Sequence, residues 1–298
     1  MPSLEVNGLR LEYETAGDAA SPPILLIMGL GMPSAAWPEG LIALLVRQGF
    51  RVIRFDNRDC GGSSRMKSDP RNSSLPMAIA RALLRLPVRA SYTLDDMALD
   101  AETLLDALQI RRAHVVGVSM GGMIAQVLAT RLPHRVASLT SIMSGTGNPR
   151  SGLGKTRALH ALLSQPEDPH NVDRVIEHYL KIFGVIGSPG FEQDETALRE
   201  HLGRIASRGY DAAGTARQLL AILASGDRRA MLGRISAPTL VIHGADDPLL
   251  PAAAGRETAR CIRSARLLMI AGMGHDLPGP LLPRLAEEIG GHCHAAGI

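Results

Sequence analysis

The sequence predicts an α/β fold with a mostly parallel, twisted sheet, helices on both faces, and a helical cap inserted in the second half of the chain. Short apolar segments alternate with segments of helical periodicity, which is the pattern of a parallel sheet covered on both faces. The alternation stops after Met143 and resumes at Pro238, and the stretch between them shows only helical spacing. One apolar strand also runs straight into a helix through a glycine-flanked serine, Ser119.

In the N-terminal part of the chain, polar turns and capping residues separate the apolar runs. The turn at 18–23 contains two prolines and divides two strands. Gly49 ends one helix, and Thr93 begins another because its hydroxyl can cap the first amides while Asp96 completes an imperfect capping box. The expected strands are Leu9–Thr15, Ile24–Met28 and Phe50–Phe55, and the expected helices are Ala35–Gln48 and Thr93–Leu108.

The C-terminal part begins with the apolar run 113–118, which is typical of a buried parallel strand. Small and apolar residues at 122–129 favour a helix directly after it. A loop rich in glycine, serine and proline at 144–150 then precedes the helical stretch. The remaining expected strands are Val136–Met143, Thr239–His243 and Leu267–Ile270, and the expected helices are Val172–Phe183, Thr196–Ser207 and Thr215–Ala224.

This order of elements predicts a core formed by residues 1–145 and 234–298 and a cap formed by residues 146–233. A cap inserted there would lie over the strand ends, where it shapes a pocket and excludes water. A second irregular stretch, 65–92, contains several prolines and could form part of a lid or a surface for another chain. For its apolar part, 77–86, burial in the core is favoured over contact with a second subunit.

The composition is that of an ordinary globular protein. The chain has 298 residues, 45% of them hydrophobic and 20% charged, with a net charge of +3 spread along the sequence. Neither a basic block nor aromatic richness suggests a nucleic-acid partner. Three widely spaced cysteines predict no disulfide framework and no metal site. No signal peptide or long apolar run is visible, so we expect a cytoplasmic protein without a membrane partner, of undetermined oligomeric state.

The catalytic candidates are Ser119, Asp247 and His275. Gly117–Gly121 fits the pattern G-x-S-x-G between a strand and a helix, where the serine hydroxyl stands clear of the backbone. Asp247 and His275 each follow a later strand, which gives the chain order serine, acid, histidine. Side chains just past the carboxyl ends of parallel strands meet at one edge of the sheet, where active sites of such folds lie.

These three residue types support nucleophilic catalysis. A neutral imidazole at His275 can take the proton of Ser119 as the serine attacks, and a carboxylate behind it fixes the tautomer and stabilises the imidazolium. The neighbouring Asp246 is an alternative acid. The glycine turn followed by Asp-Pro favours Asp247, and we expect Asp246 to cap the turn or to face solvent. The other histidines, among them His114, His160, His178 and His243, are expected to be structural or solvated.

Acyl transfer also needs hydrogen-bond donors for the developing oxyanion. The backbone amide of Met120, directly after the nucleophile, is one candidate, and the amide of Leu30 is the other. Gly29, beside Leu30, allows the backbone to approach the substrate closely and is expected to line the pocket. The charged loop 54–63 is expected to form an internal salt-bridge network rather than a substrate site, with Cys60 as a passive thiol.

These motifs resemble those of the α/β-hydrolase superfamily over nearly the whole chain except the cap. The narrower likeness is to bacterial carboxylesterases of the aclacinomycin methylesterase type, carried by the Arg-Phe-Asp-Asn-Arg-Asp-Cys-Gly loop and the Ser-Met-Gly elbow. The resemblance implies an α/β-hydrolase fold, a triad at Ser119, Asp247 and His275, and hydrolysis of methyl or carboxylic esters. Met28 departs from the pattern, since many members have histidine before the oxyanion glycine.

The leading hypothesis is a serine carboxylesterase that acts on a small-molecule ester through an acyl-enzyme and needs no metal or organic cofactor. Enol-lactone hydrolysis, carbon–carbon bond cleavage and perhydrolysis are alternatives that use the same triad. A non-catalytic ligand receptor is an alternative of another class. The low aromatic content, 3%, suggests a pocket lined by aliphatic and methionine side chains, which suits medium acyl or alicyclic groups.

Overall fold

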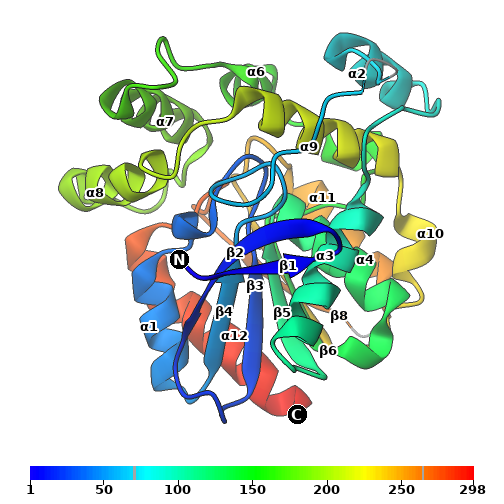
Figure 1. The fold of residues 1–298 in the computed structure, drawn as a ribbon, viewed down its shortest axis with the longest axis vertical. Coiled ribbons are helices and arrows are strands. Elements are labelled where there is room, and N and C mark those ends of the chain that lie inside the picture. The colour runs from blue at the N-terminus through cyan, green and yellow to red at the C-terminus, as the bar shows by residue number, and fades with distance from the viewer. Residues whose placement is uncertain (70–71, 264) are drawn as a thin grey trace.

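A single eight-stranded sheet forms the centre of the described part of the molecule (Figure 1). The computed structural model describes residues 1–69, 72–263 and 265–298. The strand order is β1-β2-β4-β3-β5-β6-β7-β8. Strands β1 and β2 pair antiparallel with their neighbours, and the pairs from β4 to β8 are parallel. The predicted fold class is therefore confirmed.

The strands in the middle of the sheet are buried on both faces, as their unbroken apolar runs predict. Every residue of β5 and β6 is buried. The strands are β1 (Ser3–Val6), β2 (Leu9–Ala16), β3 (Pro23–Ile27), β4 (Arg51–Phe55), β5 (Ala113–Val118), β6 (Val136–Ile142), β7 (Thr239–Gly244) and β8 (Ala265–Ile270).

Two apolar clusters, one on each face, hold helices against the sheet. The first contains side chains of α1 (Glu39–Arg47) and α12 (Leu282–Ala296), which pack on each other. The second contains side chains of α3 (Leu94–Ala107) and α4 (Met120–Arg131). The capping box predicted at Thr93 is present at the start of α3. The remaining helix of the core is α11 (Ala252–Cys261).

Two differences from the sequence-based expectations lie in the N-terminal part of the core. The predicted helix Ala35–Gln48 is divided into a short 3-10 helix, η1 (Ser34–Ala36), and α1, because Pro38 occupies the N-cap of α1 and its ring prevents a continuous helix. The edge strand β1 was not predicted. It is short and half exposed, so its apolar pattern is weak.

Between β6 and β7 the chain forms only helices in its described residues, and these lie across the carboxyl ends of the strands (Figure 1). We call these six helices the cap helices. They are α5 (Pro149–Gly152), α6 (Thr156–Leu163), α7 (Val172–Ile186), α8 (Glu195–Ala206), α9 (Ala212–Ser225) and α10 (Arg229–Leu232).

The expectation that the 77–86 segment is buried in the core is wrong. Residues 75–83 form helix α2 (Leu75–Leu83), which stands at the upper corner of the molecule beside the end of α9 (Figure 1). Met77, Leu83 and Leu84 are 56%, 51% and 71% exposed. The helix packs through the buried Ala78 and the half-buried Leu75 and Ile79, and its other large apolar side chains remain exposed. Residues 70–71 of the irregular stretch lie outside the described residues.

Candidate active site

Ser119 occupies the sharp turn between β5 and α4. Its φ of +52° lies in the left-handed region, a strain of about 1–3 kcal/mol that residues other than glycine seldom carry. Gly121 makes this turn sterically possible, because a Cβ there would lie 2.0 Å from the carbonyl oxygen of Ile27. The Ser119 amide donates a hydrogen bond to the Ile142 carbonyl at 2.9 Å, which holds the backbone of the turn. The hydroxyl therefore projects from the N-terminus of α4 into the cavity described below.

Asp247 and His275 meet Ser119 at the same edge of the sheet. His275 Nε2 lies 3.0 Å from Ser119 Oγ, and His275 Nδ1 lies 2.7 Å from Asp247 Oδ2. The amides of Leu249 and Leu250 donate to the other carboxylate oxygen of Asp247 at 2.8 and 2.9 Å. The structure thus brings together three side chains that follow β5, β7 and β8.

The environment of Asp247 keeps its carboxyl ionised. Burial by itself raises its pKa, but the adjacent His275 and the hydrogen bonds from His275 and the Leu250 amide together hold the pKa below its usual value. His243 is fully buried beside Asp247, and its Nε2 lies 2.8 Å from the Leu250 carbonyl oxygen. Asp246 instead accepts a hydrogen bond from the Gly272 amide at 2.8 Å and holds the turn, as expected.

The loop that carries Gly29 and Leu30 passes beside the serine. A Cβ on Gly29 would lie 3.3 Å from Ser119 Cβ, so the backbone comes close to Ser119 there. Gly29, Leu30 and Met120 all line the cavity around Ser119. The loop is anchored by Asn57, which donates to the Met28 carbonyl at 3.0 Å.

Gln218, on cap helix α9, also holds this loop and was missed by sequence reasoning. Its Oε1 accepts from the Gly31 amide at 2.8 Å, while its Nε2 donates to the Arg58 carbonyl at 2.7 Å. The side chain is fully buried. One glutamine therefore joins α9, the loop after β3 and the loop after β4.

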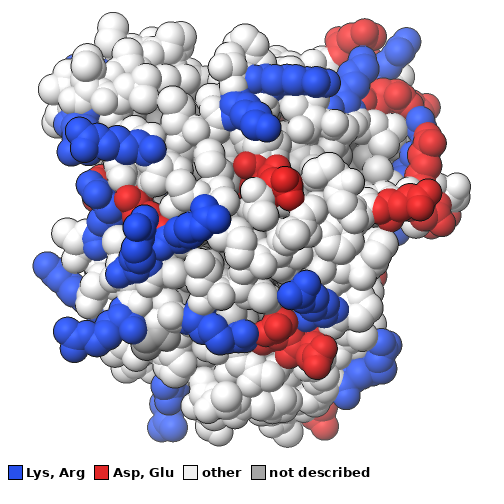
Figure 2. Space-filling model, turned by 180° about the vertical axis from the view of Figure 1, so that it is seen from behind, with Lys and Arg blue, Asp and Glu red and all other residues white. Residues whose placement is uncertain are grey.

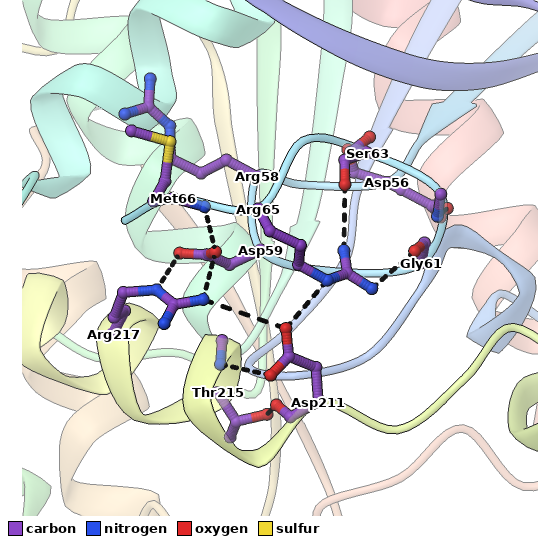
Figure 3. Close-up of polar contacts among 12 residues, drawn as sticks. Asp56, Arg58, Asp59, Gly61, Ser63, Arg65, Met66, Asp211, Thr215 and Arg217 are labelled. Atoms are coloured by element: carbon purple, nitrogen blue, oxygen red, sulfur yellow. Dashed lines mark hydrogen bonds and ion pairs between the residues drawn. The ribbon is translucent and has the colours of Figure 1, made fainter. Parts of the chain in front are cut away.

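The charged loop after β4 forms an internal network, as predicted (Figure 3). Asp59 accepts from Arg217 of α9 at 2.7 Å, and Arg65 pairs with Asp211 at 2.8 Å. Arg58 pairs with Asp100 of α3 at 2.6 Å. These pairs join the loop to both the core and the cap helices, so its charges are not free to bind substrate. Cys60 is buried within the same loop, and burial raises the pKa of its thiol, which makes it unreactive.

A cavity of about 370 Å³ lies between Ser119 and the cap helices. Its lining is predominantly aliphatic, methionine and aromatic, which is typical of small-molecule sites. Five methionines contribute to it, and their flexible side chains adapt to irregular ligands. The lining methionines are Met28, Met32, Met120, Met123 and Met143, and the polar side chains are Ser119, Tyr179, Gln193, His201, Tyr210, Thr215, His275 and Asp276.

Asp276 is a polar feature of the cavity wall that the sequence did not reveal. Its carboxylate accepts hydrogen bonds from Ser188 and, at 2.8 Å, from Gln193, both in the α7–α8 connection. Two backbone hydrogen bonds also hold the histidine loop: the His275 amide donates to Ile186, at the end of α7, at 2.7 Å, and the Gly190 amide of the connection donates to Gly272 at 2.9 Å. Burial raises the pKa of Asp276 above its usual value, although those hydrogen bonds and the nearby His275 oppose the shift.

The raised pKa of Asp276 predicts a pH-dependent cost to stability. The folded state binds this proton more tightly than the unfolded chain, so the contribution of Asp276 to folding is largest when it is protonated and falls as the pH rises through its folded pKa. We expect the free energy of unfolding of Asp276→Asn, relative to wild type, to rise as the pH is raised from about 4, the ordinary pKa of an aspartate, into the neutral range. Urea unfolding across this range measures it, with the exposed Asp18→Asn as the control. A flat or falling difference for Asp276→Asn would contradict the burial argument.

The chain is similar to known proteins in sequence and in fold. Residues 22–175 match the α/β hydrolase fold family. A rhodomycin D methylesterase from Streptomyces peucetius is 32% identical over 96% of this chain and 95% of that protein. The chain belongs to the α/β hydrolase fold family. The hydrolase is thus an enzyme of that family, and its resemblance to the aclacinomycin methylesterase type is confirmed.

Other relatives of the hydrolase are named enol-lactonases. A 3-oxoadipate enol-lactonase from Acinetobacter baylyi is 29% identical over 85% of this chain and 82% of that protein. The crystal structure of an enol-lactonase from Burkholderia xenovorans superposes with a TM-score of 0.69 at 25% identity, covering 98% of the hydrolase and 100% of that chain.

In the described ranges of the hydrolase, every helix is too short or too polar to cross a bilayer.

Proposed function

We propose that this hydrolase is a serine carboxylesterase that cleaves small-molecule esters through an acyl-enzyme. The observation that carries the proposal is the continuous chain of contacts from Ser119 Oγ through the His275 ring to Asp247, opening on an apolar cavity. A nucleophile, a base and a residue that orients the base lie within hydrogen-bond distance, as this chemistry requires.

The geometry supports two half-reactions. In the first, His275 takes the proton of Ser119 as Oγ attacks the ester carbonyl carbon, and then gives that proton to the departing alkoxide. In the second, His275 takes a proton from water, the hydroxide attacks the acyl carbon, and the carboxylic acid leaves as the proton returns to Ser119. Asp247 stabilises the imidazolium in both, and no cofactor enters either step.

We assign the oxyanion site to the amides of Leu30 and Met120. Met120 is the first residue of α4, where amides have no partner within the helix and the dipole favours negative charge. Leu30 lies opposite, on the loop held by Gln218 and Asn57. Gly29 leaves room for the acyl group beside Ser119.

The substrate class follows from the cavity and the relatives. The apolar lining and the named methylesterase relative support a methyl or short alkyl ester of a bulky, mostly apolar acid. We further propose that residues 146–233 form a cap distinct from the core of 1–145 and 234–298, which closes this cavity and excludes water.

A covalent probe and a substrate panel test the proposal. A fluorophosphonate should add its mass to Ser119 alone, and methyl esters should be turned over faster than enol-lactones or meta-cleavage products. The enol-lactonase relatives make enol-lactone hydrolysis the second candidate. Labelling of Ser119 with faster lactone turnover would select that candidate, and absence of labelling and turnover would favour a non-catalytic receptor.

Gln218→Leu tests whether the loop of Leu30 is held in place for catalysis. Removing the acceptor for the Gly31 amide should loosen the loop and lower kcat about ten- to a hundredfold, less than the loss of an oxyanion donor itself, with little change in KM. The matched control is Gln48→Leu, which removes a bond to the Ala286 carbonyl far from the cavity. Equal effects of the two variants, or a change confined to KM, would count against the assignment.

A further inference from the structure

Helix α2 carries an exposed apolar stripe that has no role in the proposed chemistry. At 100° per residue, Pro76, Met77, Ala80, Leu83 and Leu84 fall on one face, and all five are exposed. The buried Ala78 lies on the opposite face, toward α9. Leu75 and Ile79 are half-buried on that inner side, whereas Met77, Leu83 and Leu84 face outward and leave an apolar surface uncovered.

The charged residues of the segment that carries the stripe are all arginines, although one of them, Arg85, lies near Asp227. Between residues 72 and 92 the sequence has Arg81, Arg85 and Arg89 and neither aspartate nor glutamate. Arg85 and Arg89 are exposed, and Arg81 is half-buried, with its Nε bonded to the Pro87 carbonyl at 2.6 Å. On the face shown in Figure 2, charges of both signs are scattered, and the upper left corner is largely uncharged.

We propose that α2 is a docking surface for an anionic lipid membrane. An apolar face flanked by arginines is the pattern of a helix that lies in a membrane interface, with its apolar side chains in the acyl region and its cations at the headgroups. The helix stands out at a corner as a ridge (Figure 1), a shape that enters a lipid surface more readily than it receives a partner helix.

A second copy of the chain fits this surface less well. Pairing two α2 helices face to face would bring the arginines of both copies together, and the 72–92 segment has no carboxylate to neutralise them. The proposal revises the expectation of no membrane partner, which was drawn from the lack of a long apolar run. A short helix on the surface needs no such run.

Membrane docking through α2 would also place the cavity near the lipid. Helix α2 packs on α9, and Leu219, Ile222 and Leu223 of α9 line the cavity. A lipid-bound molecule would therefore hold its cap close to the membrane, where apolar compounds concentrate. The docking itself does not depend on Ser119 or on the proposed ester chemistry.

Vesicle co-sedimentation tests the proposal. We expect the wild-type protein to bind phosphatidylcholine vesicles that contain about one third phosphatidylglycerol, and to bind pure phosphatidylcholine and vesicles in ~0.5 M NaCl far less. Leu84→Glu should lower the partition coefficient roughly ten- to a hundredfold, the value of one buried leucine. Arg89→Gln should lower it about fivefold, the value of one cation near the surface.

The matched control is Leu99→Glu, which makes the same change at a 43% exposed leucine on α3. Both glutamate variants should retain the wild-type melting temperature and turnover of a water-soluble ester. Failure of the wild type to bind the anionic vesicles, or equal binding by the two glutamate variants, overturns the proposal. A dimer in analytical ultracentrifugation that Leu84→Glu dissociates, without vesicle binding, assigns the stripe to a second copy instead. Capture of an acidic protein without vesicle binding also overturns it.

Discussion

Replacing Ser119 with alanine should lower kcat for ester hydrolysis about 10⁵- to 10⁶-fold, the range found when a nucleophile of this type is removed. The reason is that Ser119 Oγ, 3.0 Å from His275 Nε2, is the atom that we propose forms the acyl-enzyme. Steady-state turnover of a p-nitrophenyl ester and mass spectrometry after fluorophosphonate treatment measure the two consequences.

Ser207→Ala is the matched control for Ser119→Ala. Ser207 directly follows α8 and is exposed, and its hydroxyl donates to the Arg204 carbonyl, so the loss of that hydroxyl should leave kcat and labelling unchanged. Melting temperatures of both variants establish that they fold. Retention of substantial turnover by Ser119→Ala would refute the serine mechanism, whatever the fold.

Two adjacent aspartates allow an equally sharp test of the acid. Asp247→Asn should lower kcat about 10⁴-fold, because the amide stabilises the wrong tautomer of His275 and cannot balance the imidazolium. Asp246→Asn should change kcat only a fewfold, since Asp246 bonds the Gly272 amide and does not touch the histidine. The pH profile of kcat separates the variants further: the loss in Asp247→Asn should be present throughout the neutral range, where the wild-type carboxyl, with its lowered pKa, is ionised.

A fall in kcat of similar size in both variants would mean that the turn as a whole, rather than one carboxylate, positions His275. A large loss in Asp246→Asn alone would reverse the assignment. The two variants make the same chemical change one residue apart, so differences in expression or net charge cannot account for either outcome.

The core and the order of the candidate triad could be predicted from the sequence because their signals are local. A buried parallel strand is an apolar run, and the residue after it lies at the same edge of the sheet wherever the strand stands in the chain. Ser119, Asp247 and His275 each follow such a run. Pro38 was also visible, and it explains why the predicted 35–48 helix is divided.

The contacts with the cap helices could not be predicted. Gln218 and Gly31 are 187 residues apart in sequence, and Ser188 and Asp276 are 88 apart, and nothing in helical periodicity encodes such pairings. The 77–86 segment shows a second limit of prediction from sequence. Its apolar composition favours burial in the core, but composition does not say whether a side chain meets the core or solvent.

Two backbone hydrogen bonds join the histidine loop to Ile186, at the end of α7, and to Gly190, in the α7–α8 connection. They affect how this protein can be redesigned. Because Ile186 and Gly190 hold the loop of His275, a chimaera that receives a foreign cap cut at β6 and β7 would also exchange part of the histidine's support. Junctions that retain residues 186–190 with the recipient scaffold should preserve turnover, whereas junctions that replace them should impair it even for an otherwise well-accepted ester. We therefore expect an exchange of the cap to change turnover together with specificity, unless the graft spares those five residues.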